Sequence, residues 1–258
     1  MTARRLRTRA LLVCAVFAAA FASGACRRGF QVRDYPSPQE LYIAGMEQFR
    51  QEKWKNAVTA LDQVVVLLGP RDTLLPRAHL YLAQAHAHRD HFLLASKSYE
   101  DLYRGFADDT LADDALLGMA DSEAKLWRRP DLDPEHGRKA SEAYALLPRL
   151  YPASPLIERA QQGGRRLAEM FGRKDFDIGM GLLRRKADIS ALIYFKAVLA
   201  DYPGTKSARD AGLKMAEIYR TLKYTEDLAE TCTQLKLLYA TDGAVRQICG
   251  SAAVDSTG

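Results

Sequence analysis

The sequence predicts an all-α protein in which about five helical hairpins stack into an α-α superhelix. From residue 37 onward, apolar and small residues recur at three- and four-residue spacing, which is typical of amphipathic helices. No segment shows strand-like alternation bounded by hairpin turns. The third observation is an internal repeat, because a fixed spacing of small and large side chains returns along the chain.

The repeat begins with a small residue, which is followed by an alanine and then by two large apolar residues, always at the same spacing. Two antiparallel helices approach closely only where small side chains face each other, and large residues then fill the groove. A hairpin of this kind cannot bury its apolar face alone, so neighbours must stack. Complete copies of the pattern are Gly45, Ala57, Leu61 and Val64; Ala83, Ala95, Tyr99 and Leu102; and Gly179, Ala191, Phe195 and Val198. Ala140, Tyr144 and Leu147 form half of another copy, with Gly118 as the candidate small residue of its first half. The pattern resembles the tetratricopeptide repeat.

The tetratricopeptide-like repeat domain is predicted to span residues 37–240. Ser37 can cap the first helix, with Pro38 at its first position and Glu40 completing a capping box. In two later turns a proline stops one helix and a hydroxyl caps the next. These turns are Tyr151-Pro152-Ala153-Ser154 and Tyr202-Pro203-Gly204-Thr205, and a fifth repeat is expected to start at Thr205.

Two places break the period. Residues 128–134 lengthen the loop of the third repeat. Gly163-Gly164 lies within a long helical stretch, and because glycine weakens a helix we expect a kink or hinge there. The basic pairs on that stretch, Arg165-Arg166 and Arg173-Lys174, are interpreted as a solvated face.

Residues 1–25 are predicted to be a lipoprotein signal peptide. A basic start leads into an apolar run from Ala10 to Phe21, and small residues then precede Cys26. The run is well short of the roughly 20 residues that span a bilayer, which argues against an uncleaved anchor helix. Small residues before a cysteine resemble the bacterial lipoprotein box, in which the thiol takes a diacylglyceryl group and the new amine a palmitate-type acyl chain. An ordinary secretory signal is the alternative.

The signal-peptide interpretation leaves two further segments outside the repeat domain, one at each end of the mature chain. Residues 26–36 become a lipidated tether that carries the lipid on Cys26, and residues 241–258 are expected to be a flexible C-terminal tail. Cys232 and Cys249 remain in a compartment that permits disulfides. Either they pair and tie the tail to the last helix, or they are two free thiols of which one is buried.

The net charge of +5 arises from the signal segment. The first 25 residues carry four arginines and no acid, so without them 33 basic residues face 32 acidic ones. A nearly neutral chain lacks the basic footprint that binds phosphate backbones. No nucleic-acid partner is therefore expected.

The sequence contains no nucleophile–base motif, phosphate loop or zinc-type cysteine spacing. His79, His86, His88 and His91 are close in the sequence, but one helix cannot point all four at one ion. The first two occupy positions that normally pack helix on helix. We therefore expect a protein that is not an enzyme and that has no cofactor and no metal site.

Beyond its repeats, the chain resembles the lipoprotein of the outer-membrane β-barrel assembly machinery, the BamD type, from about Ser37 to Tyr224. The stretches that carry this resemblance are Lys53-Trp54-Lys55-Asn56-Ala57, Asp133-Pro134-Glu135-His136, Arg149-Leu150-Tyr151-Pro152-Ala153-Ser154, Asp201-Tyr202-Pro203-Gly204-Thr205 and Arg209-Asp210-Ala211. The lipoprotein signal, the repeat count and the long third-repeat loop agree with it.

The resemblance implies a lipid-anchored scaffold at the outer membrane that faces the periplasm. Its C-terminal repeats would dock on the barrel-forming insertase, beside other assembly lipoproteins, and its N-terminal repeats would engage unfolded outer-membrane proteins. Arg184, Arg185 and Lys186 occupy the fourth-repeat loop that contacts the insertase, and Arg185 corresponds best to the family's contacting arginine. The alternative is a periplasmic repeat lipoprotein of another envelope system, Tol-Pal or polysaccharide export, since those share the Tyr-Pro-x-Ser turn.

Overall fold

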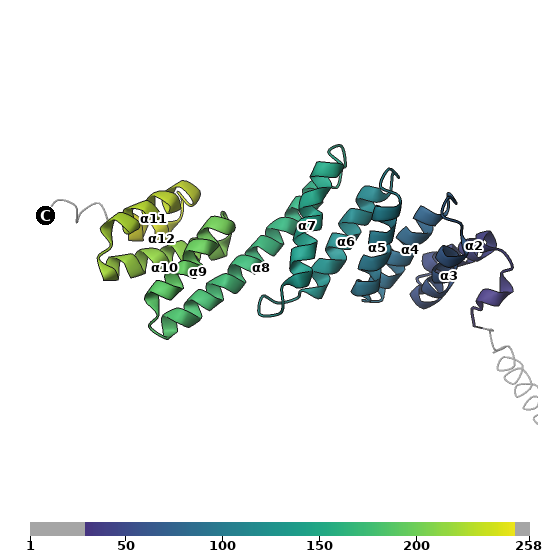
Figure 1. Ribbon diagram of the computed structural model, residues 1–258, viewed down its shortest axis with the longest axis horizontal. Helices are drawn as coiled ribbons and strands as arrows, with labels where there is room; N and C mark the ends of the chain where they lie inside the picture. The colour runs from purple at the N-terminus through teal and green to yellow at the C-terminus, as the bar shows by residue number, and fades with distance from the viewer. Residues whose placement is uncertain (1–28, 251–258) are drawn as a thin grey trace, which may run out of the picture.

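The computed structural model describes residues 29–250, and every regular element in that range is helical (Figure 1). Cys26 and the predicted signal peptide lie outside the described residues, as do residues 251–258. The elements are the 3-10 helix η1 (Val32–Asp34) and the α-helices α2 (Pro38–Arg50), α3 (Trp54–Leu67), α4 (Leu75–His88), α5 (Phe92–Gly105), α6 (Ala112–Leu126), α7 (Glu135–Leu150), α8 (Ile157–Arg184), α9 (Asp188–Asp201), α10 (Lys206–Leu222), α11 (Thr225–Leu238) and α12 (Gly243–Gly250). Among the helices between residues 29 and 250, none combines the length and the apolar character needed to cross a membrane.

Helices α2 to α11 form five antiparallel hairpins that follow one another along an elongated array (Figure 1). Each helix packs mainly on the one before and the one after it, so the core is a chain of linked clusters. Only stacking of successive hairpins buries such faces. The predicted all-α superhelix is confirmed.

Four of the five hairpins share one tight turn. Each turn has a residue with positive φ two positions before the second helix, and these residues are Glu52, Asp90, Lys186 and Lys223. The third hairpin instead has the longer connection that the sequence predicts, between Leu126 and Glu135. Lys174 on α8 holds this loop in place, because its Nζ donates to the carbonyl oxygens of Pro130 and Leu132 at 3.0 Å. The sequence pattern predicts that Lys174 belongs to a solvated face. Its hydrogen bonds to the loop show that this prediction is wrong.

Two of the three predicted side-chain caps are present. Ser37 Oγ accepts from the backbone N–H of Glu40, and Pro38 occupies the first turn of α2. Thr205 Oγ1 accepts from the N–H of Ala208 at the start of α10. These side chains satisfy N–H groups that have no partner within the helix.

The third predicted cap is absent. Ser154 does not cap α8, because that helix begins at Ile157 with Leu156 at its N-cap and no side-chain cap. Ser154 Oγ instead accepts from the N–H of Leu156.

Gly179 and Gly118 lie where two helices approach each other so closely that a side chain would not fit. A Cβ on Gly179 would lie 2.5 Å from Phe195, within the predicted fourth repeat. Gly118, however, does not face the Tyr144 helix as expected. A Cβ there would lie 2.4 Å from the ring of Tyr99 in the preceding hairpin, so this glycine sets the contact between hairpins.

Helix α8 is one continuous helix through Gly163-Gly164, where the sequence predicts a kink or hinge (Figure 1). Gly163 is buried against Tyr144, whose Cζ would lie 2.3 Å from an added Cβ. Close packing therefore accounts for the glycine at position 163.

Buried polar contacts hold the second and third hairpins together. The buried carboxylate of Glu123 on α6 accepts from Ser96 Oγ on α5 at 2.6 Å and lies 2.7 Å from His136 Nδ1 on α7. A buried carboxylate is costly without such partners. These contacts therefore favour one arrangement of three successive helices.

Both ends of the described chain are better ordered than the sequence suggests. In the expected tether, Phe30, Val32 and Tyr35 pack against the core of the first hairpin. In the expected flexible tail, residues 243–250 form α12 and bury Val245 against the fifth hairpin. Short segments gain such order from a surface already formed by the repeats, which local sequence patterns do not display.

A disulfide and an ion pair fix α12. Cys232 on α11 is bonded to Cys249 on α12, so of the two alternatives the structure contains the paired form. Asp242 accepts from the N–H groups of Ala244 and Val245, and its carboxylate receives two hydrogen bonds from Arg209. The Arg209 hydrogen bonds lower the pKa of Asp242 to about 2.

Gly163→Ala should lower the free energy of unfolding by about 1–3 kcal/mol, because the new methyl group would overlap the Tyr144 ring. Urea unfolding followed by circular dichroism measures this. Gly164→Ala is the matched control, since its Cβ would meet nothing nearer than 4.0 Å. Alanine favours helix by about 1 kcal/mol, so this control should be neutral or stabilising. Equal effects would contradict the packing argument.

Cys249→Ser should release α12 from the array. The disulfide closes a loop with a sequence separation of 17, and loops of this size are worth about 3 kcal/mol. Hydrogen exchange of the amides in residues 243–250 should become faster, while exchange in α2 to α9 stays unchanged. Unchanged exchange in α12 would show that packing and the Asp242 cap suffice to hold it.

Candidate protein-binding groove and turn

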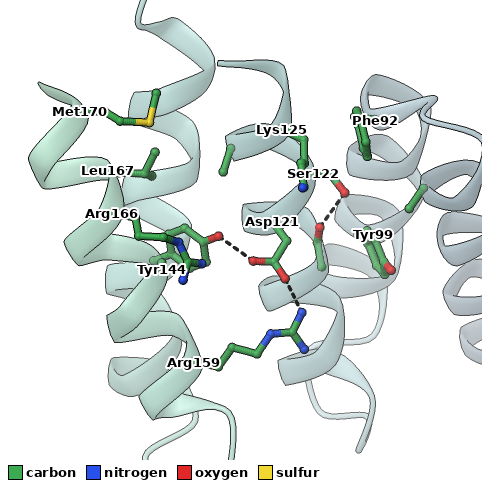
Figure 2. Close-up of a pocket in the computed structure, with 14 residues that line it drawn as sticks. Phe92, Tyr99, Asp121, Ser122, Lys125, Tyr144, Arg159, Arg166, Leu167 and Met170 are labelled. Carbon is green, nitrogen blue, oxygen red and sulfur yellow. Dashed lines mark hydrogen bonds and ion pairs between the residues drawn. The ribbon is translucent and has the colours of Figure 1, made fainter. Parts of the chain in front are cut away.

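A groove with a volume of about 580 Å³ lies across α5, α6, α7 and α8, and we call it the central groove (Figure 2). Its apolar surface comes from residues of all four helices. They are Phe92, Tyr99, Gly118, Tyr144, Gly163, Leu167 and Met170.

Two glycine–tyrosine contacts form its floor. Gly118 on α6 lies against Tyr99 on α5, and Gly163 on α8 lies against Tyr144 on α7. The same contact thus recurs one hairpin later. Each glycine leaves room for the ring and opens a hollow that any side chain at the same position would fill.

Asp121 lies at the centre of the groove wall. One of its carboxylate oxygens accepts from the Tyr144 hydroxyl at 2.6 Å, and the other pairs with the guanidinium group of Arg159 (Figure 2). This network links α6, α7 and α8. It neutralises the charge of Asp121 within the protein, since charge-assisted hydrogen bonds to a carboxylate are strong.

The two tyrosines remain uncharged at neutral pH. Burial raises the pKa of Tyr99 to about 12. Burial, and then the hydrogen bond to Asp121, raise the pKa of Tyr144. Both phenols therefore keep their proton, and the floor that their rings form carries no charge.

The rim of the groove is basic. Lys125, Arg159 and Arg166 line it, and Asp121 is its sole acid among the lining residues. Arg166, which the sequence pattern assigns to a solvated face, is exposed but borders the groove beside Tyr144 (Figure 2). An apolar floor with a basic rim suits an extended peptide that has apolar side chains and carries negative charge.

The four histidines do not converge on one point, although the ring centroids of His86 and His91 lie 6.0 Å apart. His79 and His86 are held within the helix packing, and burial lowers the pKa of both. His88 stacks on Trp54 with ring centroids 4.0 Å apart. Between residues 29 and 250, no group of three or more His, Cys, Asp or Glu side chains is placed to hold a metal ion.

The three residues predicted to bind a partner lie in the turn between α8 and α9, and all three are exposed. The turn is compact, because the N–H of Arg185 donates to Leu182 and Lys186 has a positive φ of 61°. Arg184 ends α8. The backbone therefore presents three adjacent cations on a fixed support at the edge of the fourth hairpin.

Exposed apolar side chains continue this surface along α9. Ile189 and Ile193 lie one helical turn apart and are 57% and 65% exposed. Two isoleucines beside three cations form a surface with both an apolar and a charged part. We call Arg184, Arg185, Lys186, Ile189 and Ile193 the docking turn.

Sequence reasoning missed several of these residues. Asp121 and Arg159 carried no signal, because their partners come from other hairpins. Ile189 and Ile193 could have been found, since α9 is apolar on both faces while one face suffices to pack on its neighbours.

Two solved structures are among those to which this chain is similar. A thermophilic TPR protein of Thermus thermophilus is 14% identical, with a TM-score of 0.37, over 84% of this chain and 100% of that one. A putative kinesin light chain of Podospora anserina with TPR-like repeats is 13% identical, with a TM-score of 0.40, over 80% of this chain and 97% of the other. At these scores the fold assignment rests on the helical hairpins themselves.

The family described as "YfiO: Outer membrane lipoprotein" matches residues 34–235. This range begins in η1 and ends within α11, so it takes in all five hairpins. The chain belongs to the YfiO family of outer membrane lipoproteins.

Proposed function

We propose that this protein is a scaffold of the outer-membrane β-barrel assembly machinery, attached through a lipid on Cys26 and facing the periplasm. Its membership of an outer membrane lipoprotein family supports this role. The observation that carries the proposal is the presence of two separate candidate binding surfaces on one array, the central groove and the docking turn. A repeat array is suited to holding two partners at a set distance.

The docking turn is the proposed contact with the barrel-forming insertase. Arg185 would pair with a carboxylate of a periplasmic domain, while Ile189 and Ile193 supply apolar contact. Interfaces commonly combine an apolar centre with charges that fix orientation. Other assembly lipoproteins would join the complex through the same partner.

The central groove is the proposed site for unfolded outer-membrane proteins. Such chains are extended and expose aromatic and apolar side chains, which the partly exposed side chains of Phe92 and Met170 can contact. A terminal carboxylate or an acidic side chain would be attracted to the rim cations Lys125 and Arg166.

Affinity purification of the tagged protein from detergent-solubilised envelopes tests the function. Mass spectrometry should find the barrel insertase in stoichiometric amount. Recovery of Tol-Pal or polysaccharide-export components without the insertase would indicate that the scaffold serves another envelope system, and would contradict the assembly role.

Arg185→Glu should weaken binding to the purified periplasmic domains of the insertase by at least about tenfold, since disrupting a close charge pair at an interface costs roughly 2–5 kcal/mol. Surface plasmon resonance measures the change. Lys53→Glu, an exposed cation in the corresponding turn of the first hairpin, is the matched control and should bind normally. Equal binding by both variants would show that Arg185 makes no such contact.

Arg166→Glu should weaken binding of a fluorescent peptide from the C-terminal strand of an outer-membrane protein by about three- to tenfold, because it reverses a charge at the groove rim. The difference should shrink as salt is added. Arg165→Glu changes the neighbouring exposed arginine, which does not line the groove, and should have at most a small effect. Equal losses in fluorescence anisotropy would point to general charge attraction instead of the groove.

A further inference from the structure

The first described residues are packed on the array rather than extended away from it. The rings of Phe30 and Tyr35 stack with centroids 5.5 Å apart. Both side chains, with Val32, lie against the cluster that contains Val64 and Leu68 of the first hairpin. Backbone hydrogen bonds within η1 fix the segment, including that from the Tyr35 N–H to the Val32 carbonyl at 3.1 Å.

This packing shortens the connection to the proposed lipid. Cys26 precedes Gly29 by three residues, and an extended chain spans at most roughly 11 Å over that distance. If Cys26 is lipidated, as the proposed function holds, then η1 and the helix end beneath it must lie close to the bilayer surface. The inference below therefore rests on that part of the proposed function.

The surface at this end of the array suits a membrane. Val66 and Leu67, in the last turn of α3, are 76% and 52% exposed, although the same turn packs on η1 through its other face. Arg33 in η1 and Arg71, just beyond α3, are exposed cations. Apolar side chains flanked by basic residues are the composition that binds the interfacial region of a bilayer.

The charge balance near the anchor also favours a membrane. Arg27 and Arg28 stand between Cys26 and the described residues. Of the nearby acids, Asp34 and Glu40 are exposed, and Asp72 accepts a hydrogen bond from the N–H of Leu74. Cations therefore outnumber acids at this end, which suits an anionic bilayer.

We propose that Arg33, Val66, Leu67 and Arg71 form a membrane-contact patch that lies on the bilayer in which the lipid is inserted. The lipid alone would leave the array free to rotate about a short linker. A second contact on the first hairpin restricts that rotation, so the array leaves the membrane in a defined direction. The last hairpins lie at the end of the array opposite to the patch (Figure 1). The patch thus orients the scaffold rather than merely retaining it.

The test uses the chain from Cys26 onward with a single fatty acyl chain coupled to the Cys26 thiol. The Cys232–Cys249 disulfide leaves Cys26 as the only free thiol of this form. One acyl chain binds membranes only marginally, so a further contribution from the protein is measurable. Partition into vesicles of phosphatidylethanolamine and phosphatidylglycerol is followed by sedimentation.

The double variant Val66→Asp/Leu67→Asp should partition about tenfold more weakly than the parent chain, since it removes apolar contact and adds negative charge. Leu93→Asp/Leu94→Asp is the matched control, because these leucines are 61% and 50% exposed on α5 of the second hairpin. It should partition like the parent. Equal partition of all three forms, or equal loss in both variants, would overturn the proposal.

A depth measurement serves as the second readout. For this readout Cys26 is replaced by serine and the acyl chain is placed on the N-terminal amine, so that an introduced cysteine is the only free thiol of the chain. A fluorophore on Val66→Cys should then be quenched by brominated lipid. The same fluorophore on Leu237→Cys, which is 82% exposed in the fifth hairpin, should not be. Equal quenching at both sites would refute a fixed orientation. Because the acyl chain is coupled chemically and no insertase is present, neither result depends on native lipidation or on the assembly role. Those are tested by the mass of the N-terminal peptide and by the purification above.

Discussion

The contact of a helix glycine with a tyrosine ring of the preceding hairpin is the constraint on which the arrangement depends. Gly118 on Tyr99 and Gly163 on Tyr144 bring α6 and α8 close to the hairpins before them. The helices can approach only because no side chain stands between ring and backbone. The spacing of the second, third and fourth hairpins, and with it the floor of the central groove, follows from these two contacts.

The same contacts position polar groups of the groove as well as determining its shape. With its ring held by Gly163, the Tyr144 hydroxyl reaches Asp121, which also binds Arg159. The negative charge of Asp121 is thereby neutralised by neighbouring side chains, and the rim of the groove keeps a net positive charge. The docking turn lies at the far end of α8, the longest helix, so one rigid element connects the groove to the proposed insertase contact.

The hairpins and most of their boundaries could be predicted because they depend on local spacing. Ser37 and Thr205 cap helices that begin within a few residues of them, and the proline-containing turns act on adjacent backbone. Gly118 was assigned to the wrong neighbour because a helix inside a solenoid packs on both sides, and spacing alone does not say which side needs the small residue. The order in residues 29–36 and in α12 depends on surfaces made by distant residues. The Asp121 network likewise joins three helices and leaves no local pattern.

The central claim is that one array holds two different partners at once. Analytical ultracentrifugation of the purified protein with the periplasmic domains of the insertase and a fluorescent barrel-protein peptide tests it directly. The account predicts that the peptide sediments with the complete complex, and that its affinity is the same with or without the insertase domains. Displacement of the peptide by those domains would mean that groove and docking turn serve a single partner, and would contradict the scaffold mechanism.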